Sequence, residues 1–363
     1  MNQSVQFTDT STGSPTSWQW SFGDGATSTA QNPSHSFATA ALYPVTLVVG
    51  NSSSFDSTSR TVVVVPSSMR IRFAVAADMR DYAGDNPDYF RGACEAIRAG
   101  GPVDFMICPG DIDPPGMVNY TIMSYLSAES IWYPVVGNHD AETPSDMAWL
   151  RIFNAGGSAL PNIINAGPYG AIETCYSFDY ALSHFIVLNE YYDGSSDTGS
   201  NGDVGDALLA WLVNDLAAND KPFVFVIGHE PAYPLPDEES GRLRHEYDSL
   251  NFYPDNRDRF WRTLAENNVT AYICGHTHNY SAALFDGVWQ IDVGHARGTG
   301  DTGARSTFII ISVEDSAVMD VHRLSLSTGQ YVQTSELELR TLAEAGSYKR
   351  EKAQGRIYDG AHP

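Results

Sequence analysis

Five apolar runs in this sequence each end at side chains that commonly bind metals. The last run, Val269–Ile273, leads into Cys274-Gly275-His276-Thr277-His278, which places two imidazoles two residues apart after a predicted strand. In an extended segment such residues point to the same side, and imidazole is the commonest metal ligand in proteins. A lone His-x-His pattern is weak evidence for a metal site, so the prediction depends on the four earlier runs. They are Phe73–Asp78, Phe105–Asp111, Trp132–Asp140 and Phe223–His229.

The side chains after these runs form one candidate metal site. Carboxylate, amide oxygen and imidazole suit Zn, Mn or Fe at a hydrolytic centre better than a structural Cys-based zinc site. In α/β proteins, functional groups gather beyond the carboxyl ends of the strands. Residues far apart in the sequence can therefore converge there. The candidate ligands are Asp78, Asp111, Asn138, His229, His276 and His278.

Strands and helices alternate from about residue 70, which predicts an α/β domain with buried sheets. Helices are predicted near 87–99, 116–127, 144–153, 205–218 and 256–267. Strands are predicted near 70–77, 103–108, 131–136, 174–179, 184–189, 222–228, 269–274, 280–284, 288–293, 306–313 and 317–323. The last four follow one another without helices, which indicates a second sheet. Residues 324–363 are assigned to a C-terminal extension, in which Tyr331–Leu337 is a further candidate strand.

Residues 1–66 differ in composition and in hydrophobic pattern from the rest of the chain. They are rich in Ser, Thr and Gly, and short β-type runs alternate with turn residues, which predicts a small all-β sandwich. Trp20 is expected in its core, and His35 is expected to be a structural hydrogen-bonding residue. Pro66-Ser67-Ser68 is predicted to link this sandwich to the α/β domain.

Composition limits the possible partners. The chain has 363 residues, which favours more than one domain, and a formal charge of −23. The field of such a chain repels nucleic acid and anionic membranes, so no nucleic-acid partner is expected. Bound cations can still attract phosphate locally. No run is apolar and long enough to span a bilayer. Cys108 and Cys274 are predicted to be buried thiols, while pairing of Cys94 with Cys175 is left open.

The first unit resembles a PKD domain, an immunoglobulin-like module common in secreted bacterial enzymes. The matching residues are Trp18–Gly25, Asn32–His35 and Tyr43–Leu47. The resemblance implies a spacer, or a module that binds a polysaccharide or a surface protein. The sequence begins directly in a strand-like run, so we expect a secreted or periplasmic protein whose signal peptide was replaced by the initiator Met.

The α/β part, over roughly residues 70–323, resembles the calcineurin-like metallophosphoesterase family. The resemblance rests on the ordered motifs Asp78, Gly110-Asp111, Gly137–Asp140, Gly228–Glu230 and Gly275–His278. Tyr176–Tyr180 and His184–Asn189 look like the branch that contains the purple acid phosphatases. The resemblance implies two sheets packed face to face and flanked by helices, in an α/β/β/α arrangement.

The same resemblance implies two divalent or trivalent metal ions that share Asp111. The ligands of the first are Asp78, Asp111 and His278. The ligands of the second are Asp111, Asn138, His229 and His276. A metal-activated hydroxide would then hydrolyse a phosphate mono- or diester, while His139 protonates the leaving oxygen.

Arg80 departs from the family pattern, which has Asp-x-His where this chain has Asp78-Met79-Arg80. Arginine has no lone pair for a cation, and the tyrosine used by purple acid phosphatases is replaced by Pro114. Water or Asp113 fills the gap, or the first site is empty and one metal remains, or Arg80 grips a substrate phosphate as a catalytic residue. A structural ion pair of Arg80 with Asp78 or Asp81 is the plain alternative. We expect a weakened two-metal site.

An alternative function is an extracellular binding or adhesion protein whose phosphoesterase domain is catalytically weakened.

Roles are also predicted for other residues of the α/β domain. Asp140 and Glu230 are predicted to hydrogen-bond behind the metal ligands. His184 is predicted to be a satisfied core histidine and His295 a loop residue. The polar insertion 233–255, with His245 and Tyr247, is a candidate cap over the site.

Overall fold

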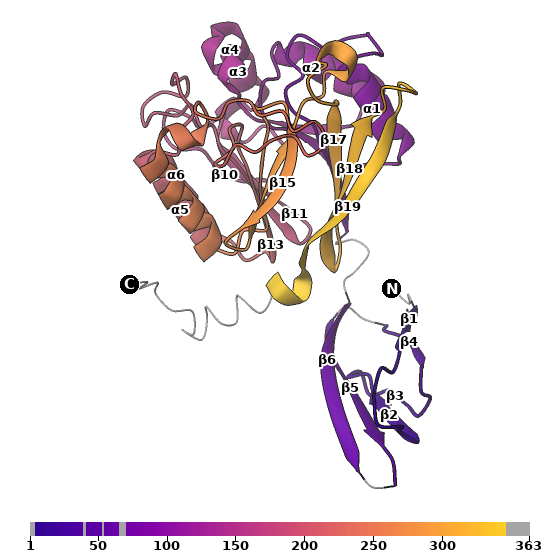
Figure 1. Ribbon diagram of the computed structural model, residues 1–363. Helices are drawn as coiled ribbons and strands as arrows, with labels where there is room; N and C mark the ends of the chain where they lie inside the picture. Colours follow the sequence, from indigo (N-terminus) through magenta and orange to yellow (C-terminus); the bar gives the residue numbers. More distant parts are fainter. Residues whose placement is uncertain (1–3, 39–40, 53, 65–69, 346–363) are drawn as a thin grey trace. The chain divides into compact units, whose positions relative to one another are not determined.

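The computed structural model describes residues 4–38, 41–52, 54–64 and 70–345. The chain divides into two compact units, one of residues Met1–Arg70 with Thr341–Pro363 and the other of Ile71–Arg340. Figure 1 shows the course of the chain through both. The linker predicted at Pro66-Ser67-Ser68 and the tail after residue 345 lie outside the described residues.

The N-terminal unit is a small β-structure with an aromatic core. Its sheets are β1 (Ser4–Gln6) with β4 (Ser34–Ser36), and, in spatial order, β3 (Thr27–Ser28), β2 (Ser17–Ser21), β5 (Ala41–Gly50) and β6 (Phe55–Val64). Trp20 is buried in the core, as predicted. His35 bonds Asp24 at 2.7 Å and stacks on Phe22 at 4.2 Å, which confirms a structural role.

The second unit contains a six-stranded mixed sheet. Its spatial order is β19 (Tyr331–Thr341), β18 (Ser316–Leu324), β17 (Thr307–Val313), β7 (Ile71–Val75), β8 (Phe105–Cys108) and β9 (Ile131–Pro134). Strands β7, β8 and β9 are parallel, and β17 runs antiparallel to β7. The parallel strands therefore end at the same edge of the sheet.

A seven-stranded mixed sheet forms the other half of this unit. Its order is β10 (Ile163–Ala166), β11 (Tyr176–Tyr180), β12 (Ser183–Val187), β13 (Phe223–Ile227), β14 (Ala271–Cys274), β16 (Val288–Val293) and β15 (Tyr280–Phe285). Strands β12, β13, β14 and β16 are parallel. The strands on either side of this parallel group are antiparallel to it.

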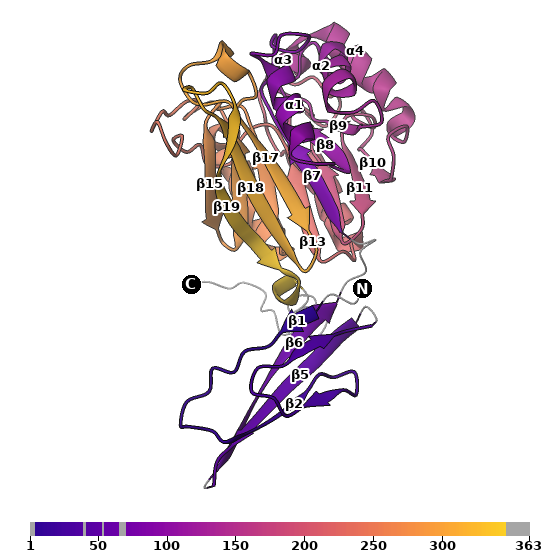
Figure 2. The same ribbon diagram turned by 90° about the vertical axis from the view of Figure 1, so that its right-hand side faces the viewer.

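The two sheets pack face to face through aromatic side chains. Phe73 of the first sheet lies 5.1 Å from Phe185 and 5.5 Å from Phe225 of the second, measured between ring centroids. Helices α1 (Phe90–Ala99), α2 (Pro115–Thr121) and α4 (Pro144–Phe153) pack on the outer face of the six-stranded sheet. Helices α5 (Asp206–Ala218) and α6 (Pro254–Glu266) cover the seven-stranded sheet. Figures 1 and 2 show these four layers, which confirm the predicted α/β/β/α arrangement.

One short α-helix and one short strand of the α/β unit were not predicted, and one boundary of that unit differs from the prediction. Helix α3 (Asn138–Glu142) and strand β10 have only 5 and 4 residues, too few for a periodic pattern to register. Strand β19 joins the six-stranded sheet, so the compact unit continues to Arg340, beyond the limit expected at residue 323. The candidate strand at Tyr331–Leu337 is thus part of the α/β unit.

The four cysteines are free and buried, so Cys94 and Cys175 do not pair. Among the described residues, no helix is both apolar enough and long enough to cross a bilayer.

Candidate metal centre

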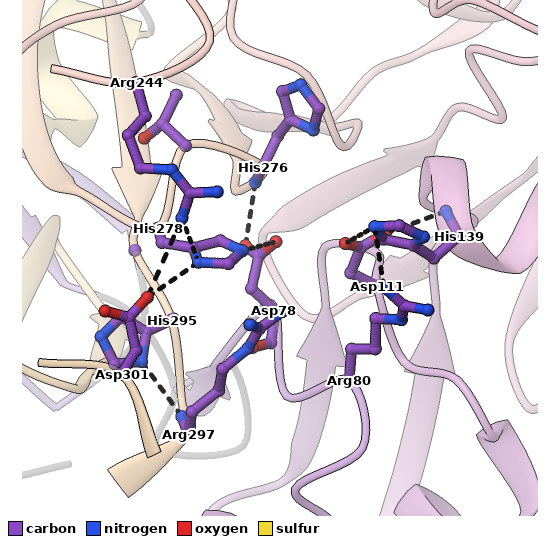
Figure 3. Close-up of polar contacts among 12 residues, drawn as sticks. Asp78, Arg80, Asp111, His139, Arg244, His276, His278, His295, Arg297 and Asp301 are labelled. Carbon is purple, nitrogen blue, oxygen red and sulfur yellow. Dashed lines mark hydrogen bonds and ion pairs between the residues drawn. The ribbon is translucent and has the colours of Figure 1, made fainter. Parts of the chain in front are cut away.

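The predicted ligands meet at one edge of the two sheets because each follows the carboxyl end of a strand. Asp78 follows β7, Asp111 follows β8, and Asn138 begins α3 after β9. His229 follows β13, and His276 and His278 follow β14. Figure 3 shows His278 turned toward Asp78 and His139 turned toward Asp111. The convergence that the sequence predicted is present in the structure.

The backbone at four of these positions adopts a conformation that residues with a side chain rarely take. The φ angles are 53° at Asp78, 51° at Asp111, 71° at His276 and 59° at His278. Non-glycine residues in the left-handed region cost free energy and concentrate at functional sites. The surrounding fold therefore holds these side chains in place against a local preference.

Gly137 and Gly275, which each precede a ligand motif, make room for a ligand of another motif. A Cβ on Gly137 would lie 2.2 Å from the backbone nitrogen of Asp111. A Cβ on Gly275 would lie 2.4 Å from Oδ2 of Asp78. No side chain fits at such distances, so the glycines are a steric requirement of the site.

The first predicted set of ligands forms a compact group. Asp78, Asp111 and His278 each offer a ligand atom within 4.8 Å of the others, and Nε2 of His278 lies 3.6 Å from Oδ1 of Asp78. Oδ1 of Asp78 is buried and has no hydrogen-bond partner among the described residues. Burial, and then the charge of Asp111, raises the pKa of Asp78 well above its usual value. A cation would relieve both the missing partner and the repulsion.

The second predicted set is centred on the imidazole of His229. Its Nε2 lies 3.5 Å from Oδ1 of Asp111, 3.3 Å from Oδ1 of Asn138 and 3.2 Å from Nδ1 of His276. Asp111, Asn138 and His276 thus each place a potential ligand atom next to the same nitrogen of His229. Nitrogen and oxygen ligands of this kind suit a transition-metal ion.

The tautomers of the two histidines in this set follow from their other contacts. Nδ1 of His229 donates to the carbonyl of Pro109 at 2.8 Å, and Nε2 of His276 donates to the carbonyl of Asp248 at 3.1 Å. The nitrogens that face each other at 3.2 Å therefore both present lone pairs. Two lone pairs in this position repel unless a cation lies between them, and backbone carbonyls commonly orient metal-binding imidazoles in this way.

The three histidines are also in the protonation state that binds metal. Burial lowers the pKa of His229 and lowers that of His276 well below its usual value. Burial lowers the pKa of His278 to about 3, although its hydrogen bond with Asp301 opposes the shift. All three imidazoles are neutral near pH 7, so no proton has to leave before a metal binds.

Buried carboxylates lie behind the ligands. Asp140 accepts a hydrogen bond from the backbone of Gly137 at 2.8 Å, as predicted. Glu190 accepts from the backbone nitrogens of His229 at 2.9 Å and Glu230 at 2.7 Å, and burial raises its pKa to about 7. Glu190 was not among the predicted site residues. It also follows an apolar strand, β12, which is the signal that would have found it.

His139 and Arg80 lie beside the second set (Figure 3). Nε2 of His139 is 3.8 Å from Oδ2 of Asp111 and 3.2 Å from Nη1 of Arg80, and the His139 side chain is 32% exposed. The closest ion pair of Arg80 is with Asp113, at 2.8 Å, and Asp81 is 3.7 Å away. Arg80 thus forms an ion pair with Asp113, the carboxylate that was a candidate to replace the missing metal ligand.

The insertion 233–255 reaches the centre. Arg244 Nη1 lies 2.6 Å from Nδ1 of His278, and the ring of His245 lies 4.1 Å from that of His276. The carbonyl of Asp248 holds His276, as described above. The candidate cap therefore contributes directly to the site, whereas the side chain of Tyr247 is exposed.

Two further histidines have structural roles, as predicted. His184 is enclosed by two carboxylates, with Nδ1 2.8 Å from Asp179 and Nε2 2.7 Å from Asp215. Nε2 of His295 donates to the carbonyl of Ala304 at 3.1 Å.

The chain belongs to the calcineurin-like phosphoesterase family, whose family model matches residues 71–280. A PKD domain model matches residues 1–65. The phosphoesterase family uses divalent metals, in agreement with the ligand groups described above. Family membership supports metal-dependent phosphoester hydrolysis as the general activity.

Several solved structures are similar to this chain at low sequence identity. PhoD is 12% identical with a TM-score of 0.51, and the match covers 95% of this chain and 85% of that one. GAP50, the anchor in the inner membrane complex of Plasmodium, is 15% identical with a TM-score of 0.49, covering 77% and 94%. A putative 5'-nucleotidase from Staphylococcus aureus is 15% identical with a TM-score of 0.42, covering 78% and 58%. No curated protein matches the sequence.

Proposed function

We propose that the α/β unit hydrolyses phosphate mono- or diesters with metal ions held by the six predicted ligands. The facing lone pairs of His229 and His276, 3.2 Å apart, are the observation that carries the proposal. The buried and unpartnered Oδ1 of Asp78 supports a second cation in the first set. Both features are unfavourable in a metal-free site and favourable in a loaded one.

The proposed metal pair shares Asp111. Asp78 and His278 complete the first set, and Asn138, His229 and His276 complete the second. When bound, Zn, Mn or Fe ions would supply Lewis-acid activation of water and of the phosphoryl oxygens. Because Arg80 replaces a ligand and engages Asp113, we expect the first site to bind its metal more weakly than the second.

We assign the leaving-group proton to His139. Its ring is partly exposed beside Asp111, so a substrate at the metal ligands would lie within its reach. Nη1 of Arg80 lies 3.2 Å from Nε2 of the same ring, and this guanidinium would attract the phosphate. General-acid help of this kind contributes about 10²–10⁴-fold.

The N-terminal unit is proposed to be an accessory module. PKD domains are typical of extracellular proteins, so we propose a secreted or periplasmic protein whose PKD domain binds a polysaccharide or a surface protein. Co-sedimentation of the full chain with insoluble polysaccharides tests the first partner class. A chain that stays in the supernatant would exclude the polysaccharides tried.

Hydrolysis of nitrophenyl phosphate and bis-nitrophenyl phosphate with added Zn or Mn tests the activity. We expect turnover that chelators abolish and that His276→Ala reduces at least 100-fold, on the scale of a lost metal ligand or its support. His322→Ala, on β18, is the matched histidine control and should retain activity. If neither ester is hydrolysed with any metal, the alternative of a binding protein with a weakened phosphoesterase domain is favoured.

A further inference from the structure

Arg244 is a poorly neutralised cation at the edge of the metal centre. Its side chain is 35% exposed, and the only carboxylate within 4.0 Å among the described residues is Asp301, at 3.8 Å. Its closest contacts are ring nitrogens, with Nη1 2.6 Å from His278 and Nη2 3.3 Å from His245. Histidine rings do not compensate the charge of a guanidinium. The chain carries 44 acidic residues, so the shortage is local.

Two other arginines near the site, Arg80 and Arg242, have closer carboxylate partners. Arg80 pairs with Asp113 at 2.8 Å. Arg242 pairs with Asp301 at 3.1 Å and also donates to the side chain of Asn279 at 2.8 Å. Arg244 therefore differs from Arg80 and Arg242, and an anion is the natural partner for its free donors.

Two contacts anchor the segment that leads into Arg244. Asp237 forms a buried ion pair of 2.6 Å with Arg323 of β18. Arg242 donates to the carbonyl of His278 at 2.9 Å, which ties the segment to the metal-ligand loop. Arg244 lies two residues beyond Arg242, so these contacts fix where its backbone lies.

Arg244 and His139 lie on opposite sides of the aspartates. In Figure 3, Arg244 approaches the His278 side of Asp78, whereas His139 and Arg80 lie beside Asp111. If the leaving group departs next to His139, as proposed above, the part of the phosphate that does not leave faces Arg244. That part carries a terminal, charged oxygen in a monoester and an ester group in a diester.

We propose that Arg244 is a specificity-determining residue that selects phosphate monoesters over diesters. The inference rests on the proposed function and names its substrate class. A monoester has a second pKa of about 6, so it is mainly a dianion near pH 7, while a diester is a monoanion. A cation that meets the additional charge in a partly desolvated site discriminates by about tenfold or more.

The test compares wild type with Arg244→Ala, Arg244→Lys and Arg259→Ala. Arg259 lies on α6 and pairs with Asp206, so its loss removes one positive charge away from the site. For Arg244→Ala we expect kcat/KM to fall about 10-fold to 100-fold for nitrophenyl phosphate and less than threefold for bis-nitrophenyl phosphate. Arg244→Lys should recover most of the difference, and Arg259→Ala should show none.

A second measurement distinguishes a role of Arg244 in binding phosphate from a role in stabilising the fold. Calorimetry of inorganic phosphate binding to the metal-loaded protein needs no turnover, and we expect Arg244→Ala to weaken it by about tenfold. Equal losses for both esters, or unchanged phosphate binding, would overturn the proposal. Failure of wild type to hydrolyse either ester would instead overturn the proposed function, while phosphate binding still tests Arg244.

Discussion

Asp111 is the residue on which both sets of ligands depend. It lies within the compact group of Asp78 and His278, and its Oδ1 is also 3.5 Å from His229. Its backbone is held at a φ of 51°, and its Oδ1 accepts from the backbone of His139 at 3.2 Å. One carboxylate thus links both ligand sets to the proposed general acid.

Arg80 explains why the two metal sites should differ, and Arg80→His is the direct test. The substitution supplies an imidazole at the position that the family uses as a ligand. It also frees Asp113 from its 2.8 Å ion pair. We expect the affinity of the weaker site to rise by about 10-fold to 100-fold, measured by metal titration with an indicator. If the variant and the wild type bound the two metals with the same affinities, Arg80 would not be the cause of a weaker first site.

His139→Ala separates chemistry from metal binding. His139 is next to the ligands but is not assigned as one, so the metal content should stay at the wild-type level. We expect kcat to fall by about 10²–10⁴-fold for an ester with a poor leaving group. A nitrophenyl ester, which leaves easily, should lose less. Equal losses for the two leaving groups would contradict a general-acid role.

At the scale of elements, the strands that deliver the ligands were predictable because each is an apolar run with a sharp end. Phe223–Ile227, for example, is buried throughout and stops at Gly228. The insertion 233–255 was harder, because contacts such as that between Arg244 and His278 join residues 34 apart and leave no periodic signal. Glu190 contacts His229 across 39 residues, but its position after the apolar strand β12 was a usable signal.

The close approach of α3 and the β8 loop predicts a large effect of Gly137→Ala. The new Cβ would lie 2.2 Å from the backbone nitrogen of Asp111, so the two loops must separate. We expect a loss of about 1–3 kcal/mol in the free energy of unfolding and weaker metal binding. Calorimetric melting and metal titration measure the two effects.

Gly100→Ala is the matched glycine control. Gly100 has a φ of −74°, and its added Cβ would come no closer than 3.4 Å to a neighbour. That variant should keep wild-type stability and metal affinity. An equal change in both variants would show that the effect of Gly137→Ala is not steric crowding at the site.

At the scale of the whole molecule, the α/β unit carries a buried charged group away from the metals. His184 is enclosed by Asp179 and Asp215, whose hydrogen bonds and charges raise its pKa despite burial. The hydrogen bond from His184 contributes most to lowering the pKa of Asp215 against the effect of burial. The pair links β12 to α5 and stabilises the unit in its charged form.

The sign of the pH dependence follows from these shifts. The contribution of His184 to stability is fully present below pH 6.5 and is lost as the pH rises through its raised pKa. The contribution of Asp215 is present above pH 3.8 and is lost as the pH falls through its lowered pKa. Urea unfolding of the full chain, followed between pH 2 and 9, should show a loss of stability at both ends.

His184→Ala should destabilise the α/β unit by about 3 kcal/mol near pH 6, because it leaves a buried carboxylate without its partner. The alkaline loss of stability should shrink in this variant. An unchanged slope between pH 6.5 and 9 would show that His184 is not the group responsible.

The central claim is that side chains from both sheets hold metal ions at their common edge. Anomalous scattering from crystals grown with Zn tests it most directly, because it locates the ions independently of activity. We expect a peak at about 2.0–2.2 Å from both Nε2 of His229 and Nδ1 of His276, and a weaker one beside Asp78 and His278. Strong peaks elsewhere, with none between His229 and His276, would contradict the claim.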